Sequence, residues 1–152
     1  MPLPESLFTL ANLAVLPAWA LLVLAPRSKW TARLVAPVLI PALLSLLYLY
    51  LLVTRWARLP DAFGSLADVR RLFDDPAFLL AGWLHYLAFD LFIGSWEVRN
   101  AQRLGLPHLA VVPCLLLTLF FGPVGFLSYL VVRGSVGRRL WIDEDLRPSP
   151  EE

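Results

Sequence analysis

The sequence predicts an all-α integral membrane protein, a bundle of four transmembrane helices with one short interfacial helix between the second and third. Three observations support this prediction. Apolar residues make up 59% of the chain and charged residues only 16%, against roughly a quarter in soluble domains. The mean hydropathy is +0.68. The charges leave long gaps, and a hydrocarbon core of about 30 Å needs an apolar helix of about 20 residues.

The four charge-poor segments span residues 7–25, 31–54, 76–96 and 109–132. Trp30 and Trp56 frame the second segment, which is typical of the membrane–water interface. The segments leave too little sequence for a separate soluble core. We therefore expect a transmembrane domain over residues 1–134 and a polar tail over residues 135–152.

Local signals refine two of these helices. The third should continue past its apolar part to Arg103, because Gly105 and Pro107 then supply a stop. Ser65, followed three residues later by Asp68, is typical of a helix N-cap. We expect a short helix to begin there and to lie on the membrane surface.

The basic residues give a weak orientation signal. With four spans, eight of them share the side of the N-terminus and five lie opposite, which favours both termini in the cytoplasm. No basic residue precedes the first segment, which argues against a secretory signal or a transit peptide. Arginine outnumbers lysine, which favours a bacterial origin. We expect a bacterial inner membrane or a thylakoid-type membrane.

Several classes of function fit poorly. The net charge of +1 gives no reason to expect a nucleic-acid partner. Cys114 is the single cysteine and cannot form an intramolecular disulfide. A metal site needs three or four ligands at close spacing, whereas His85, Asp90, Glu97 and His108 would spread over about 35 Å of helix. We expect no metal.

The third segment carries the ionisable residues of interest, His85 and Asp90. Such groups are costly at bilayer depth and usually serve a function. Tyr86, Asp90, Gly94 and Glu97 recur at three- or four-residue steps and share one helix face. His85 precedes Asp90 by five residues and lies about 140° around the helix. A substrate between helices could still contact both side chains.

Structural roles compete with these functional ones. Asp90 could be a buried acid paired with Arg99 or Arg133. His85 could be a core histidine bonded to a backbone carbonyl. Glu97 could be a solvated interfacial charge. The aromatic residues of this region for which packing or a place in the interfacial belt is the simpler interpretation are Trp83, Tyr86 and Trp96.

The fourth segment contains a Gly122-Pro123 break, which weakens helical hydrogen bonding and allows close contact between helices. A turn near residues 103–104 would place Thr118 at the depth of Asp90 and the break at the depth of His85. The alternative is that the break is only a packing kink.

One set of motifs lies within about residues 78–133. It consists of Trp83-Leu84-His85, Phe89-Asp90-Leu91-Phe92-Ile93-Gly94-Ser95-Trp96, Gly105-Leu106-Pro107, Gly122-Pro123-Val124-Gly125-Phe126-Leu127 and Arg133. In these motifs the chain resembles the abscisic-acid-deficient-four-like family. Plant members of this family are small membrane proteins required for forming neoxanthin from violaxanthin. The resemblance therefore implies membrane-bound carotenoid or isoprenoid metabolism.

The implied reaction converts an epoxide into an allene and a tertiary alcohol, which needs an acid and a base but no redox cofactor. We assign Asp90 as the acid and His85 as the base, and the reverse assignment is nearly as plausible. The residues expected to contact the substrate are Tyr86, Trp83, Gly94, Glu97, Thr118, Gly122 and Pro123.

Two other functions remain open. The chain could be a non-catalytic subunit that binds a carotenoid or lipid, or a small proton-coupled transporter acting as a dimer. The expected partners are membrane lipids, a carotenoid or other polyene, and a second copy of the chain in a homo-oligomer.

Overall fold

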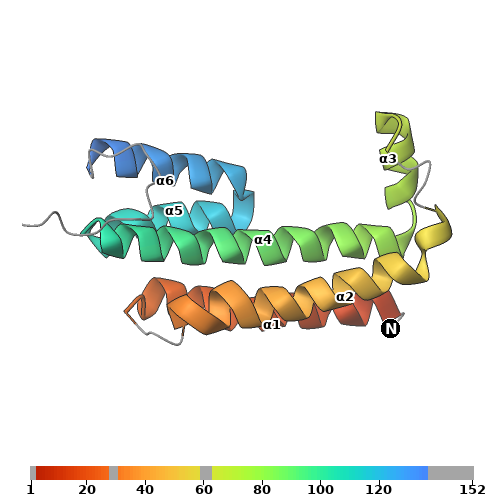
Figure 1. Cartoon of the computed structure of the whole chain (residues 1–152), viewed down its shortest axis with the longest axis horizontal. Coiled ribbons are helices and arrows are strands. Elements are labelled where there is room, and N and C mark those ends of the chain that lie inside the picture. The colour runs from red at the N-terminus through yellow and green to blue at the C-terminus, as the bar shows by residue number, and fades with distance from the viewer. Residues whose placement is uncertain (1–2, 28–30, 59–62, 137–152) are drawn as a thin grey trace, which may run out of the picture.

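A computed structural model describes residues 3–27, 31–58 and 63–136. Within these ranges the elements are all helical, joined by short turns, and there is no strand. Three long helical segments lie side by side, and α4 is central among them (Figure 1). The prediction of an all-α protein is confirmed.

Three helices are long and apolar enough to cross a bilayer. They are α1 (Leu3–Leu24), the segment Leu34–Thr54 and α4 (Pro76–Arg103), with 22, 21 and 28 residues. The second combines a π-helical stretch, η1 (Thr31–Leu39), with α2 (Ile40–Thr54). Each exceeds the roughly 20 residues that a hydrocarbon core requires.

A fourth span is not confirmed. The segment predicted as one helix forms α5 (His108–Phe121) and α6 (Pro123–Ser135), and α6 folds back along α5 as a hairpin (Figure 1). Helices of 14 and 13 residues rise only about 20 Å each, short of the hydrocarbon thickness.

The reversal has a local cause at Gly122. This residue has a φ of +30°, a conformation that side chains rarely adopt, and Pro123 begins the next helix without needing a backbone donor. A Cβ on Gly125 would overlap the backbone of Thr118, so glycine there lets α6 lie directly on α5. The predicted kink is a turn.

The predicted short helix is confirmed as α3 (Leu66–Phe73), which lies across the end of the bundle (Figure 1). Ser65 caps it: its hydroxyl accepts from the Asp68 backbone N–H at 3.2 Å. A Cβ on Gly82 of α4 would lie 2.9 Å from the Phe73 ring, so α3 rests closely on α4. A 3-10 turn, η2 (Trp56–Arg58), precedes it.

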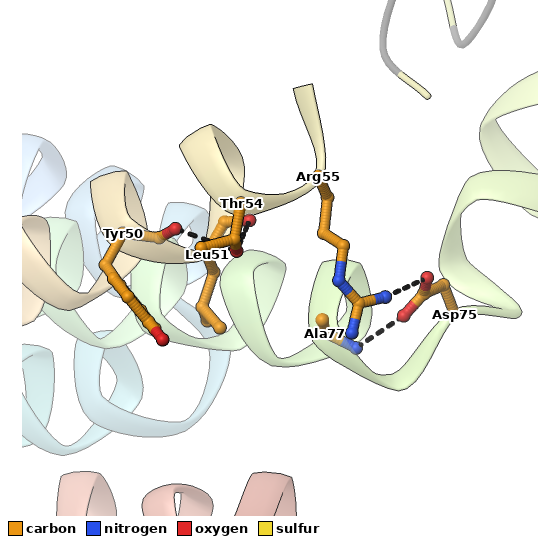
Figure 2. A network of polar contacts seen from close by, with 6 residues as sticks. All are labelled: Tyr50, Leu51, Thr54, Arg55, Asp75 and Ala77. Carbon is orange, nitrogen blue, oxygen red and sulfur yellow. Dashed lines mark hydrogen bonds and ion pairs between the residues drawn. The ribbon is translucent and has the colours of Figure 1, made fainter. Parts of the chain in front are cut away.

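An ion pair joins the end of α2 to the start of α4. Arg55 Nη1 donates to Asp75 Oδ2 at 2.6 Å, and Asp75 Oδ1 caps α4 by accepting from the Ala77 backbone N–H at 2.9 Å (Figure 2). On the same turn, Thr54 donates to the carbonyl oxygens of Tyr50 and Leu51, both at 3.0 Å.

The third predicted helix also ends as expected. α4 runs to Arg103, and Gly105 follows with a φ of +67°. Closer to its middle, a Cβ on Gly94 would lie 2.5 Å from the ring of Trp19, so α1 and α4 approach closely there. α4 thus contacts both the α1 layer and the hairpin.

The ends of the described chain bear on the predicted orientation. α1 begins at one end of the bundle and α6 finishes at the other (Figure 1). The placement of both termini on one side is therefore not supported. Residues 137–152, most of the predicted tail, and Trp30 lie outside the described residues, and Trp56 is exposed.

Candidate functional site

Asp90 lies in the middle of α4, half-buried against the hairpin turn. The hydroxyl of Tyr86, one turn earlier, donates to the carbonyl oxygen of Leu119 at 3.1 Å and also lies within hydrogen-bonding reach of the Asp90 carboxyl. A phenol has a single proton to donate, so the Leu119 carbonyl oxygen and the Asp90 carboxyl compete for the hydrogen bond from Tyr86.

Gly122 brings the turn against this carboxyl. A Cβ at Gly122 would lie 2.6 Å from Asp90 Oδ1, so glycine satisfies both the turn conformation and the close approach. Pro123, the first residue of α6, is exposed beside it. The second oxygen, Asp90 Oδ2, is buried and has no hydrogen-bond partner among the described residues.

Glu97 lies two turns further along α4 and is fully buried. Thr118 of α5 donates to Glu97 Oε1 at 3.0 Å, and Glu97 Oε2 has no hydrogen-bond partner in the described part of the chain. The interpretation of Glu97 as a solvated interfacial charge is wrong. Because α5 begins only at His108, the pairing is shifted: Thr118 lies with Glu97 rather than with Asp90.

The same shift moves the Gly122 turn from the predicted depth of His85 to that of Asp90. His85 lies elsewhere. Its ring is exposed, stacks on Phe89 at a centroid distance of 4.5 Å, and lies 6.0 Å from the ring of Tyr48 on α2. No contact among the described residues joins His85 to Asp90.

Trp83 and Gly94 lie away from the Asp90 carboxyl. The indole Nε1 of Trp83 donates to Asn12 Oδ1 of α1 at 3.2 Å, and its ring lies 5.3 Å from Phe8. With Glu5 it lines a small cavity of about 260 Å³ at the α1–α4 edge. Gly94 accommodates the ring of Trp19, which is a packing role.

Two polar residues that we did not select, Asn100 and Tyr129, lie near Glu97, and Arg133, considered above only as a partner of Asp90, lies near Tyr129. Tyr129 of α6 donates to Asn100 Oδ1 of α4 at 2.7 Å, and both are buried. Arg133, four residues after Tyr129, is buried as well. Their spacing was visible in the sequence, but only a helix that returns to α4 brings Tyr129 to Asn100.

Neither of the two arginines considered as partners of Asp90 forms an ion pair with it in the described residues. Arg99 Nη1 donates to Ser95 Oγ at 3.2 Å. No ion pair to Asp90 occurs within the described ranges, so burial and Tyr86 define its surroundings. Likewise, the described residues contain no group of three His, Cys, Asp or Glu side chains placed to hold a metal.

Comparison with known proteins supports the resemblance. The chain is 28% identical over 144 residues to "Protein ABA DEFICIENT 4, chloroplastic" of Arabidopsis thaliana, covering 89% of this chain and 64% of that protein. This relative gives no support to a bacterial origin. No solved structure matches the chain. The ABA DEFICIENT 4-like profile matches residues 6–129, well beyond the motifs around α4, and the chain therefore belongs to the ABA DEFICIENT 4-like family.

Proposed function

We propose that this chain is a membrane-embedded protein of carotenoid or related isoprenoid metabolism, and that it isomerises an epoxy-carotenoid to an allene in the manner of a neoxanthin synthase. Membership of the family supports the carotenoid context. The observation that carries the chemistry is Asp90, a carboxyl held in the middle of a membrane helix by Tyr86 and the Gly122 turn.

Each step of the proposed reaction balances without an electron donor. The Asp90 carboxyl gives its proton to the epoxide oxygen, the adjoining C–O bond breaks, and the oxygen becomes a tertiary hydroxyl. A base removes a carbon-bound proton, and the electrons of that C–H bond form the second double bond of the allene. The product is an isomer of the substrate, and no cofactor takes part.

The base is the less constrained assignment. We propose His85, whose imidazole ring offers a nitrogen that can accept the carbon-bound proton. Because His85 and Asp90 lie on different faces of α4, the substrate must contact both faces. Tyr86 and Glu97 lie on the Asp90 face and are the alternative partners.

Lipophilic substrates could reach Asp90 from the bilayer. Asp90 is half-buried. Two aromatic side chains close to it in the chain are exposed: Phe89, which precedes Asp90 in α4, and Phe121, which precedes the turn. A polyene lying on this surface would place an end ring near the hairpin turn. Thr118 and Pro123 are the hairpin residues we propose to border that ring.

The proposed membrane disposition follows from helix length. α1, the η1–α2 segment and α4 cross the bilayer, and the α5–α6 hairpin enters from the side on which α4 ends. In this disposition Asp90 and the Gly122 turn lie well inside the hydrocarbon. Surrounding lipids and a second copy of the chain are the proposed partners.

The test is conversion of a supplied epoxy-carotenoid by the purified protein without added electrons. Asp90→Asn should abolish conversion while insertion and purification stay normal, because the amide keeps the shape but supplies no acid. Asp74→Asn, which changes an exposed carboxyl at the end of α3, is the matched control and should convert normally. An active Asp90→Asn protein would contradict the assignment.

His85→Gln belongs to the same experiment. If His85 is the base, conversion falls and the acidic limb of the pH profile, measured from about pH 5 to 9, flattens. Unchanged conversion and an unchanged profile would exclude His85 and turn attention to Glu97 and Tyr86 as partners of Asp90.

A second candidate function is non-catalytic binding of a carotenoid or lipid. The apolar cavity of about 260 Å³ between α1 and α4, lined by Phe8 and Trp83, favours it. Pigment that copurifies and is returned unchanged, identified by mass spectrometry, would support binding. Product formed from the same pigment would support the isomerase.

A further inference from the structure

A line of polar side chains follows α4 from Asp90 toward the C-terminal end of that helix, and the proposed reaction uses only part of it. We call this line the polar file. It consists of Tyr86, Asp90, Glu97, Thr118, Asn100 and Tyr129. The last four are buried between α4 and the α5–α6 hairpin. Buried polar groups in a membrane bundle often mark ion or proton pathways.

Hydrogen bonds pair the file across the helices. Thr118 donates to Glu97 Oε1 at 3.0 Å and Tyr129 donates to Asn100 Oδ1 at 2.7 Å. Asn100 follows Glu97 by three residues, so both face the hairpin. Glu97 also lies close enough to the Tyr129 hydroxyl to act on it electrostatically. Two hydrogen-bonded pairs therefore follow one another along the file from Glu97 to Tyr129.

Between Asp90 and Glu97 the file has a gap with two unsatisfied acceptors. Asp90 Oδ2 and Glu97 Oε2 are both buried and have no hydrogen-bond partner in the ranges that the structure describes. The two residues are about 10 Å apart along the helix axis, and their carboxyl groups act on each other electrostatically. Buried polar atoms are normally hydrogen-bonded, and two buried carboxyl oxygens without protein partners on one helix face suit bridging water.

We infer that the polar file is a proton path in which water bridges Asp90 and Glu97, and Glu97 relays protons between Asp90 and the aqueous side at the end of α4. Glu97 gives its proton through the water to ionised Asp90 Oδ2. The Glu97 carboxylate then takes up a proton that enters from the aqueous side at the end of α4 and passes the Tyr129 hydroxyl. No electrons move. The use of this path in turnover rests on the proposed function, but the path itself does not.

Among the titratable and charged side chains around Glu97 in the described residues, Glu97 itself is the one suited to relay a proton. Tyr86 and Asp90 precede it on α4, Cys114 lies on α5, and Tyr129 and Arg133 lie on α6. The Cys114 thiol donates to the carbonyl of its own helix at 3.8 Å. A guanidinium has N–H donors and no acceptor, so Arg133 cannot take up a proton and pass it on.

The experiment is infrared spectroscopy of the full chain in lipid nanodiscs after transfer from H₂O to D₂O. The carbonyl band of protonated Asp90, identified as the band lost in Asp90→Asn, shifts when its proton exchanges. In the wild type we expect exchange much faster than that of the core α4 amides. In Glu97→Gln we expect exchange slower by about tenfold or more, because an amide cannot release and regain a proton.

Tyr129→Phe serves as the second variant, should Glu97→Gln fail to accumulate, and should also slow exchange. Ser128→Ala, on the neighbouring α6 position outside the file, should exchange like the wild type. The inference is overturned by a wild-type protein with no protonated Asp90 band, or with one exchanging as slowly as core amides. It is also overturned by wild-type rates in both Glu97→Gln and Tyr129→Phe. The exchange rates of the variants do not depend on carotenoid conversion, so wild-type exchange in both variants overturns the path alone, whereas a missing protonated Asp90 band would also contradict the proposed acid.

Discussion

Gly122 shows how one residue can set both a turn and a site. Its φ of +30° reverses the chain, and the absence of a side chain lets Asp90 approach the backbone. A non-glycine residue would meet both a conformational penalty and an overlap with a buried carboxyl. The close contact ties the hairpin to α4 at the depth of the proposed acid.

Gly122→Ala should lower the free energy of unfolding by about 2 kcal/mol or more, since it combines backbone strain with overpacking. Denaturation in mixed detergent micelles measures this change. Gly105→Ala is the matched control, because Gly105 has a φ of +67° but open space where a Cβ would lie. Its cost reports the backbone strain alone.

The excess cost at Gly122 should shrink when Asp90→Ala is added, because the overlap disappears while the strain remains. Equal costs for Gly122→Ala and Gly105→Ala would show that the Asp90 contact contributes nothing.

Single residues of the site were partly predictable from the sequence. Asp90 and Glu97 could be selected because ionisable groups within an apolar helix are costly wherever they lie. Their partners could not, because Thr118 pairs with Glu97 only through the register of α5, which depends on where the turn before His108 ends.

Among the helices, α3 is stabilised by interactions within its own first turn. The Ser65 hydroxyl donates to the Asp68 carboxylate at 2.6 Å and accepts from its backbone N–H, and Arg71 pairs with the same carboxylate. The hydrogen bond from Ser65, and then that from Arg71, hold the pKa of Asp68 below its usual value of 3.8.

A lowered pKa gives the pH dependence of α3 a definite sign. The ionised carboxylate stabilises α3 fully above pH 3.8, and this contribution is lost as the pH falls through the lower pKa of the folded state. Ser65→Ala should raise the pKa of Asp68 toward 3.8, and Arg71→Gln should raise it less. Carboxyl ¹³C chemical shifts in detergent measure both. An unchanged pKa in Ser65→Ala would contradict the cap.

The helices differ in how far the sequence determines them. α3 and the end of α4 could be predicted because a cap and a Gly105 stop are local signals. The α5–α6 hairpin could not, because hydropathy along residues 109–132 is the same whether the chain continues or reverses. The reversal depends on contacts between helices at Gly122 and Gly125.

At the scale of the whole molecule, three helices of the described chain are long and apolar enough to cross a bilayer, and the fourth predicted segment reverses as a hairpin. In the proposed disposition the hairpin enters and returns on one side, which places the two ends of the described chain on opposite sides of the membrane. The eight-to-five distribution of basic residues assumed four crossings, so it does not apply to this disposition. Composition predicts the membrane class, whereas the topology also depends on where the chain reverses.

Cysteines placed at Ser6 and Ser135, in a Cys114→Ala background, should label from opposite sides of sealed vesicles. Ser6 lies in the first turns of α1 and Ser135 ends α6. A membrane-impermeant maleimide, added before and after permeabilisation, makes the measurement. Labelling of both positions from one side would restore the fourth crossing and exclude the hairpin.

The Arg55–Asp75 ion pair ties the end of α2 to the start of α4 across the segment that connects them. It joins positions 20 residues apart, and α2 and α4 pack directly on one another beside it. A pair with partly exposed side chains adds little affinity by itself, so we expect the apolar interface to hold the helices together and the pair to set its register. We therefore expect the protein to be divisible: two polypeptides separated between η2 and α3 should retain the packing surfaces needed to reassemble inside a bilayer.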